Sequence, residues 1–156
     1  MSETPIRVDL GPMDHLMPTV YTAAVCYLAM KPGVSATEVF AYLQEGLHRT
    51  FLQVPWLSGK VHRQARDTPG WRPGKLEIRY SPSTADGPQP YQFRFNELES
   101  ATHYPDLKAS AFPLDTFDDK DLLWVETWQA DLDVGVEVVV AQANFMPGAC
   151  LLAFGM

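Results

Sequence analysis

The stretch from Val136 to Met156 constrains the fold of this chain more than any other. It reads VEVVVAQANFMPGACLLAFGM, two apolar runs separated by Pro147-Gly148. Proline presets φ for the first central position of a type II turn, and glycine accepts the positive φ of the second. Two apolar runs joined in this way predict a β-hairpin whose second arm is buried on both faces. A domain usually tapers into polar residues, whereas this chain ends within the second apolar run. We therefore expect that the chain ends in mid-strand and that its sheet needs further strands.

Length and composition narrow the class of protein. The 156 residues suffice for a single domain, with 46% hydrophobic and 20% charged residues, which is typical of globular proteins. The net charge of −7 without a cluster of Lys and Arg argues against nucleic acid as a partner. Because we find no secretory signal and no apolar run of about 18–20 residues, we expect no membrane association. Cys26 and Cys150 lie in apolar runs and are predicted to be buried free thiols, which favours a cytoplasmic location.

One helix is strongly predicted. Ser35 and Glu38 are spaced as a capping box, in which each side chain binds the backbone N–H of the other residue. Pro55 cannot continue a helix, so the helix should stop before it. Between these signals, apolar residues keep the spacing of one helical face: Phe40, Leu43, Leu47, Phe51 and Val54.

Most other segments resemble strands. Their composition predicts strands at residues 6–10, 20–30, 60–64, 75–80, 91–95, 122–127 and 136–145. The run at 20–30 is expected to be a buried strand, although its periodicity also fits a helix, and residues 96–121 should hold only short helical pieces. Together these elements predict an α/β (α+β) domain built on a mixed β-sheet with one principal amphipathic helix.

Several segments together carry a family resemblance. In order and spacing they resemble BAHD-type, CoA-dependent acyltransferases, in particular the fungal branch similar to trichothecene 3-O-acetyltransferase. The similarity covers nearly the whole chain and implies the N-terminal lobe of that fold. The segments are LGPMDHLMP (10–18), LQEGLHRTFLQVPWLSG (43–59), PGKLEIRY (73–80), FRFNEL (93–98) and AQANFMPGACLLAFGM (141–156).

The resemblance implies transfer of an acyl group, expected to be acetyl, from CoA to a hydroxyl or amine of a hydrophobic secondary metabolite. In that family the histidine of a His-x-x-x-Asp motif is the base, and here the motif would begin beyond Met156. We therefore assign no catalytic residue to this chain and expect it to be inactive alone, with acyl-CoA as co-substrate and no cofactor of its own. A second polypeptide or a C-terminal fragment would complete the fold. Two alternatives stay open: a non-catalytic binding or scaffold protein, and a truncated product.

Five residues are candidates for the acceptor channel. In the resembled family the loop around Asp14 lies near that channel, which implicates His15, Met17 and Tyr21. Asp14 and His15 could form an acid–base pair, but adjacency in sequence does not orient them, and a loop-closing role for Asp14 is favoured. The other two candidates are Gln142 and Asn144, polar amides on one face of an apolar strand. Once buried they must find hydrogen-bond partners, either by bracing neighbouring strands, which we favour, or by lining the channel.

Other chemistries lack their signatures. The four histidines (His15, His48, His62 and His103) and two cysteines do not have metal-ligand spacing, so no metal site is predicted. Ser58-Gly59 lacks the G-x-S-x-G frame of a serine hydrolase, and no dinucleotide or nucleotide-triphosphate motif occurs. The four tryptophans are interpreted as packing residues and loop anchors in preference to a ligand platform.

Overall fold

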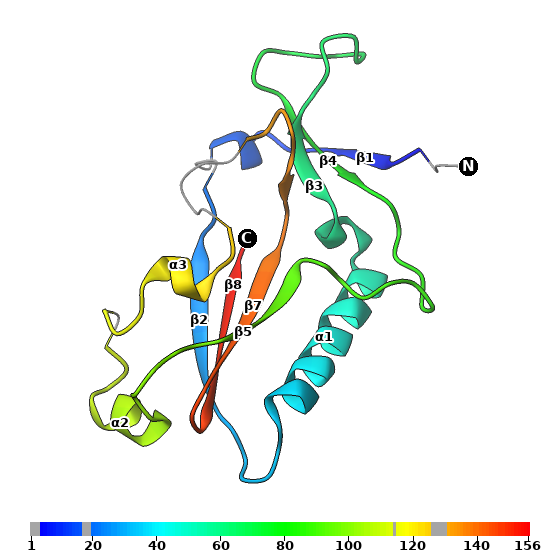
Figure 1. Cartoon of the computed structure of the whole chain (residues 1–156). Coiled ribbons are helices and arrows are strands. Elements are labelled where there is room, and N and C mark those ends of the chain that lie inside the picture. The colour runs from blue at the N-terminus through cyan, green and yellow to red at the C-terminus, as the bar shows by residue number, and fades with distance from the viewer. Residues whose placement is uncertain (1–3, 17–19, 114, 126–130) are drawn as a thin grey trace.

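The protein folds around two four-stranded sheets. The computed structural model describes residues 4–16, 20–113, 115–125 and 131–156. The first sheet has the strand order β1-β4-β3-β6 and the second has the order β2-β8-β7-β5 (Figure 1). The predicted α/β class is confirmed, but the strands divide between two sheets instead of forming one. Among the described residues, no helix combines the length and apolar character that crossing a bilayer requires.

The elements have the following bounds. The strands are β1 (Ile6–Asp9), β2 (Ala23–Ala29), β3 (Lys60–Arg63), β4 (Leu76–Tyr80), β5 (Phe93–Glu97), β6 (Val136–Glu137), β7 (Val140–Met146) and β8 (Ala149–Gly155). The helices are α1 (Ala36–Gln53), α2 (Tyr104–Ala109) and α3 (Asp119–Leu122), with 3-10 turns η1 (Asp14–Leu16) and η2 (Pro55–Ser58).

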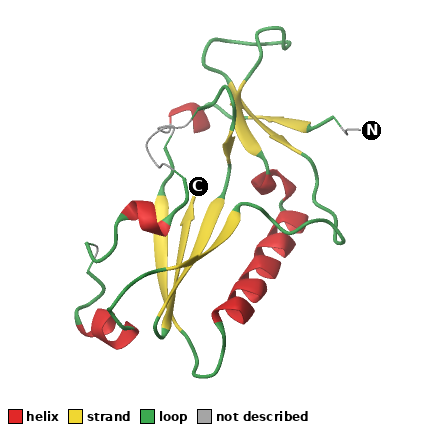
Figure 2. Cartoon of the chain, viewed as in Figure 1, coloured by secondary structure: helices red, strands yellow, loops and turns green. Residues whose placement is uncertain are grey.

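Helix α1 forms as its capping signals predict. The Glu38 N–H donates to Ser35 Oγ at 3.2 Å, and the Ser35 N–H donates back to Glu38 Oε2 at 2.9 Å. The helix ends at Gln53, just before Pro55. Its apolar face covers the second sheet, where the ring of Phe40 stacks on Phe93 with centroids 4.8 Å apart (Figure 2).

The predicted hairpin is confirmed as β7 and β8. Met146 lies opposite Ala149, so Pro147 and Gly148 form a two-residue turn, and Gly148 has the expected positive φ of +80°. Strand β5 runs parallel to β7 on the other side, which makes the second sheet mixed. The hairpin thus supplies the two central strands of that sheet.

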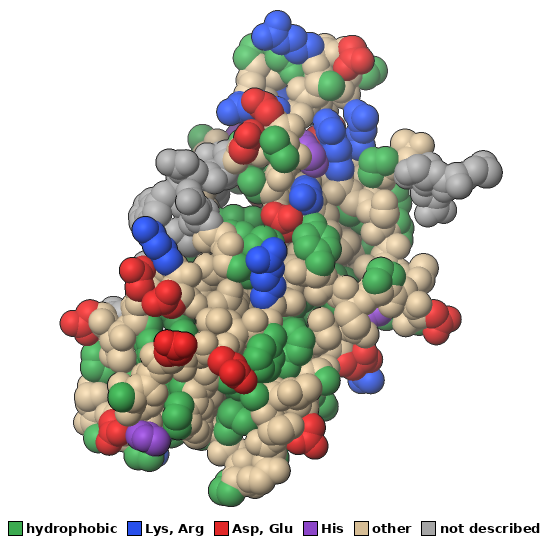
Figure 3. Space-filling view, in the orientation of Figure 1, with side chains coloured by type: hydrophobic (Ala, Val, Ile, Leu, Met, Phe, Trp, Pro, Cys, Tyr) green, Lys and Arg blue, Asp and Glu red, His purple; other side chains and the backbone are tan. Residues whose placement is uncertain are grey.

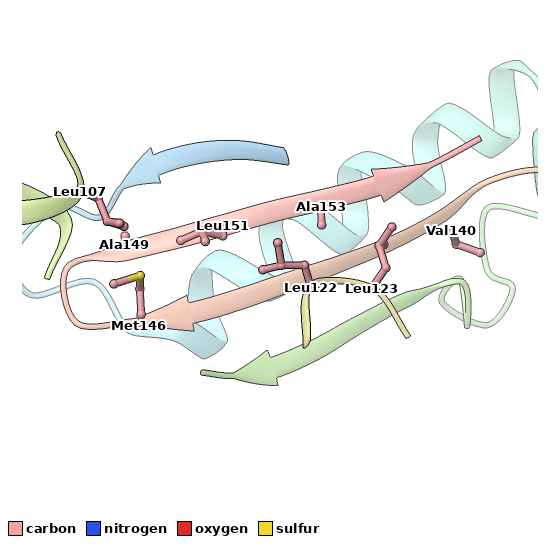
Figure 4. Packing of buried hydrophobic residues seen from close by; sticks show 8 residues of the cluster. All are labelled: Leu107, Leu122, Leu123, Val140, Met146, Ala149, Leu151 and Ala153. Atoms are coloured by element: carbon pink, nitrogen blue, oxygen red, sulfur yellow. The ribbon is translucent and has the colours of Figure 1, made fainter. Parts of the chain in front are cut away.

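The second sheet is covered on both faces, because side chains alternate along β7. Ala141, Ala143 and Phe145 point to the α1 side. Val140 and Met146 point to the opposite side, where they pack with residues of α2, α3 and the segment after α3 (Figure 4). The second sheet is therefore the middle one of three layers, with α1 on one face and α2, α3 and the segment after α3 on the other.

The strand predicted at 122–127 is wrong for the part that the structure describes; residues 126 and 127 lie outside it. Asp118 starts a helical turn instead, since its Oδ1 accepts from the Lys120 N–H at 3.0 Å and its carbonyl accepts from the Asp121 N–H at 2.9 Å. Leu122 and Leu123 then pack onto the second sheet as buried side chains. Apolar composition predicted their burial correctly, but not the backbone conformation.

The prediction that residues 20–30 form a buried strand is also wrong in part. Strand β2 exists, but it lies at the edge of the second sheet and most of its side chains are exposed. The α1 face that covers β5, β7 and β8 leaves β2 open, so Cys26 is exposed while Cys150 is buried. Of the two thiols, only Cys150 behaves as predicted.

This difference predicts selective thiol chemistry. Burial raises the pKa of Cys150 to about 11, so near pH 8 it stays a protonated thiol that no reagent reaches. In native protein at pH 8, iodoacetamide is expected to modify Cys26 at least about tenfold faster than Cys150. Peptide mass mapping after timed labelling measures both rates, and unfolding in urea should equalise them. Comparable native rates would contradict the burial of Cys150.

Candidate functional site

An apolar groove of about 440 Å³ lies along one face of the first sheet. Val61, Ile78 and Val136 are direct cross-strand partners on β3, β4 and β6, so their side chains share one face. Leu76 lies two positions from Ile78 and joins the same face. The other face of this sheet carries charged pairs such as Lys60 and Glu137, 3.1 Å apart. This division makes the groove a site for apolar groups.

The second wall of the groove comes from the residues before β2 and after β8. Tyr21 and Met156 lie there, together with Val20 and Thr22. Thr22 and Met156 are joined by two backbone hydrogen bonds of 3.0 and 3.3 Å, which extend the β2–β8 ladder to the rim. The groove therefore lies where the two sheets meet. On the face drawn in Figure 3, Lys and Arg side chains concentrate over the first sheet and the β3–β4 loop, whereas apolar patches lie over the second sheet and α1.

Tyr21, a predicted channel residue, lines this groove. Its hydroxyl donates to the carbonyl oxygen of Glu137 at 2.8 Å. Burial, and then the negative carboxylate of Glu137, raise the pKa of Tyr21 far above the usual value for a phenol. Tyr21 therefore stays neutral at physiological pH and cannot serve as a proton acceptor.

Asp14 and His15 do not form an acid–base pair. Asp14 lines the groove, and its Oδ2 accepts from the Gly11 N–H at 2.8 Å, so its loop-closing role is confirmed. The Leu76 N–H donates to His15 Nε2 at 3.0 Å, which places the ring proton on Nδ1, 2.8 Å from the Gly11 carbonyl. With both nitrogens bound to backbone, His15 holds the loop of η1 against β4.

Gln142 and Asn144 brace the second sheet. They do not line the groove; they point to the α2–α3 side, where Asn144 is fully buried. Asn144 Nδ2 donates to the carbonyls of Leu122 at 3.0 Å and Leu151 at 3.2 Å, and its Oδ1 accepts from Gln142 Nε2 at 2.7 Å. The amides thus bind carbonyls that the short helix α3 leaves free at its end. Their predicted place in an acceptor channel stays a prediction, and Met17 lies outside the described residues.

Sequence reasoning missed most of the groove residues. Strands 60–64 and 75–80 were predicted, but Val61 and Ile78 were not recognised as a common apolar face. Part of the signal was available, because residues 75–80 (KLEIRY) alternate apolar and charged side chains, whereas residues 60–64 (KVHRQ) hold a single apolar residue, Val61. Neither the register of three strands nor the position of β6 could be read from that alternation.

The two four-stranded sheets and the long helix α1 form an arrangement that is already known. Known structures share this fold. TRI101 of F. sporotrichioides, complexed with coenzyme A and T-2, matches 96% of the chain with a TM-score of 0.70 at 22% identity. TRI101 of F. graminearum, complexed with ethyl coenzyme A, matches 97% with a TM-score of 0.71 at 17% identity. In both cases the match spans 34% of the larger chain.

The chain belongs to the family of trichothecene 3-O-acetyltransferase-like N-terminal domains, whose model matches residues 20–156. The acyltransferase BOA11 of Botryotinia fuckeliana is 28% identical over 151 residues, which are 92% of this chain and 30% of BOA11. The isocyanide synthase-NRPS hybrid crmA of Aspergillus fumigatus is also 28% identical, over 93% of this chain and 8% of crmA. The chain therefore spans about a third or less of the length of these relatives.

Proposed function

We propose that this chain is the N-terminal part of an acyltransferase that moves an acyl group, expected to be acetyl, from CoA to a hydroxyl or amine of a hydrophobic secondary metabolite. The groove carries this proposal, because its walls are mostly apolar, with Asp14 and Glu137 as the charged residues of its lining, and Tyr21 contributes a neutral hydroxyl. Such a surface suits an apolar acceptor with few polar groups. The solved relatives that hold coenzyme A together with T-2 mycotoxin or deoxynivalenol support the same substrate classes.

The proton-accepting histidine is proposed to come from a second polypeptide or a C-terminal fragment that completes the fold. Among the described residues that line the groove there is no imidazole, and the nearby His15 uses both ring nitrogens. A base in the partner would take the acceptor's proton, the acceptor oxygen or nitrogen would attack the thioester carbonyl carbon, and CoA would leave as the thiolate. Such a base contributes a factor of roughly 10²–10⁴ to the rate. We place this reaction in the cytoplasm.

A binding protein without catalysis is the second candidate. The observation that favours it is that residues of this one chain already build the groove. Such a protein would hold an apolar metabolite without changing it.

The first test measures CoA release. Purified chain incubated with acetyl-CoA and deoxynivalenol or T-2 mycotoxin is expected to release no CoA above background, because no imidazole lines the groove in the described ranges of the chain. Chain isolated from its native cells together with a co-purifying polypeptide is expected to release CoA, and mass spectrometry identifies that polypeptide. Turnover by the purified chain would contradict the need for a partner. Acceptor binding without turnover in either preparation would favour the binding protein.

A matched pair of variants tests the groove in the active preparation. Val136→Trp fills the groove and is expected to lower kcat/KM for the acceptor by at least about tenfold, because it removes apolar volume that the acceptor needs. Val134→Trp is the control, since Val134 is 72% exposed and does not line the groove. Equal rates for the two variants would show that the acceptor binds elsewhere.

A further inference from the structure

We propose that this chain forms a symmetric dimer in which β2 pairs antiparallel with β2 of a second copy, with Cys26 facing Cys26 of the second copy. The two second sheets would then join into one continuous sheet. The proposal does not rest on acyl transfer; it rests on the direction of the backbone groups along β2, on the composition of this edge and on its register.

The hydrogen-bond pattern shows which groups of β2 point outward. Thr22 and Met30 donate to Met156 and Gly148, at 3.0 and 2.9 Å, in the ladder that pairs β2 with β8. In an antiparallel ladder every second residue turns its N–H and C=O toward the partner strand, so Ala24, Cys26 and Leu28 do the same. The intervening residues Ala23, Val25, Tyr27 and Ala29 turn theirs away from β8. In the described part of the chain, β2 pairs with no other strand.

Composition singles out β2 among the four edge strands. Edge strands of monomers usually carry charges that prevent pairing with another chain. Strand β1 carries Arg7 and Asp9, β5 carries Arg94 and Glu97, and β6 carries Glu137. Strand β2 reads AAVCYLA, with no charge and no proline, and most of its side chains are exposed. It is the edge that lacks protection.

The strand is complementary to itself in one register. When two copies of Ala23–Ala29 pair antiparallel over their full length, the twofold axis passes beside Cys26. All outward N–H and C=O groups then meet outward groups of the other copy, and Cys26 occupies a non-hydrogen-bonded pair, in which side chains are closest. A shift in either direction that preserves this alternation shortens the overlap.

The side chains that meet in this register fit each other. On one face Val25 lies opposite Tyr27 of the second copy, a pairing of β-branched and aromatic residues that stabilises sheets. On the other face Ala24 lies opposite Leu28, which is 39% exposed in the single chain. The pairing covers part of this apolar surface and brings no like charges together. A second copy of the chain is therefore the partner that the edge fits.

Sedimentation and cross-linking test the proposal on the full chain. Sedimentation equilibrium is expected to show twice the monomer mass at micromolar concentration. A short bis-maleimide is expected to link two chains through Cys26, because Cys150 is buried. A monomer at all concentrations, or a dimer that does not link through Cys26, would overturn the proposal.

Two lysine variants locate the interface. Ala24→Lys places a charge on the exposed face of β2 beside Leu28 of the second copy, and is expected to weaken dimerisation at least about tenfold and to abolish the cross-link. Ala41→Lys makes the same change on an exposed position of α1 and is expected to leave both unchanged. Circular dichroism checks that each variant is folded. Cross-linking that persists equally in Ala24→Lys would also overturn the proposal, because it would then reflect collision or another interface.

Discussion

Replacing Asn144 with alanine is expected to lower the free energy of unfolding by about 3 kcal/mol, since it leaves several buried polar groups without partners. The carbonyls of Leu122 and Leu151 each lose a donor from Asn144. The side-chain amides of Gln142 and Asn96 lose their shared acceptor, Asn144 Oδ1, although each also donates to the Asp121 carbonyl. Urea denaturation followed by tryptophan fluorescence measures the loss.

Asn96→Ala is the matched control for this variant. Asn96 is only half-buried and donates to Asp121 at 3.2 Å and to Asn144 at 2.8 Å. Its removal frees no fully buried carbonyl, so the expected loss is about 1 kcal/mol. Losses of equal size at the two positions would show that the network does not act through Asn144.

Asn144→Asp probes the same contacts through pH. One carboxylate oxygen would face the carbonyl oxygens of Leu122 and Leu151, which disfavours the charged form, so the pKa in the folded state should lie above the ordinary value for Asp of about 3.9. A raised folded pKa means that the relative stability is retained at low pH and lost as pH rises through that pKa. The difference in free energy of unfolding between this variant and the unmodified chain is therefore expected to be smaller at pH 5 than at pH 8. The same difference at both pH values would mean that the carboxylate has found other partners.

The second large effect is expected at Gly59, where alanine should lower the free energy of unfolding by about 2–3 kcal/mol. Gly59 follows η2 and has a φ of −85°, so its conformation suits any residue. The constraint is space, because an added Cβ would lie 2.7 Å from the Arg79 carbonyl oxygen and 2.8 Å from Tyr80 Cβ. Backbone in the middle of a sheet cannot move away without disturbing the pairing of β3 with β4. Chemical denaturation with urea gives the size of the effect.

Gly46→Ala provides a control with the opposite sign. Gly46 lies inside α1, and no heavy atom comes within 4 Å of the position of its missing Cβ. Alanine in an exposed helix interior is favoured over glycine by about 1 kcal/mol, so this variant should gain stability. A similar loss in both glycine variants would contradict the close approach at Gly59.

Signals that act over a few residues predicted the fold well. The pair Ser35 and Glu38 gave the start of α1, Pro55 gave its end, and Pro147-Gly148 gave the hairpin turn. Each of these is local chemistry that neighbouring residues decide. The predicted strand over 136–145 corresponds to two strands, β6 in the first sheet and β7 in the second. Between them, the Val138 N–H donates to the Gly59 carbonyl. No periodicity in the run marks that point.

Long-range contacts explain what could not be predicted. Whether β2 is buried depends on which strands α1 covers, and α1 lies over β5, β7 and β8. The segment after Asp118 has the apolar composition of a strand, yet its carbonyls are bound by the amides of Gln142 and Asn144. The groove likewise requires the register that places Val61 between Ile78 and Val136. In each case a residue distant in sequence decides the outcome.

The pairing of β2 with β8 also has a consequence for how the protein is made. Ala29 pairs with Ala149, so β2 leaves the ribosome long before its partner strand β8 has been synthesised. During that interval the backbone N–H and C=O groups of β2 are unpaired on both sides, and its side chains carry no charge. Closing such a long loop delays folding until translation has passed Gly155, and a chaperone that shields extended apolar segments would be most needed in that window.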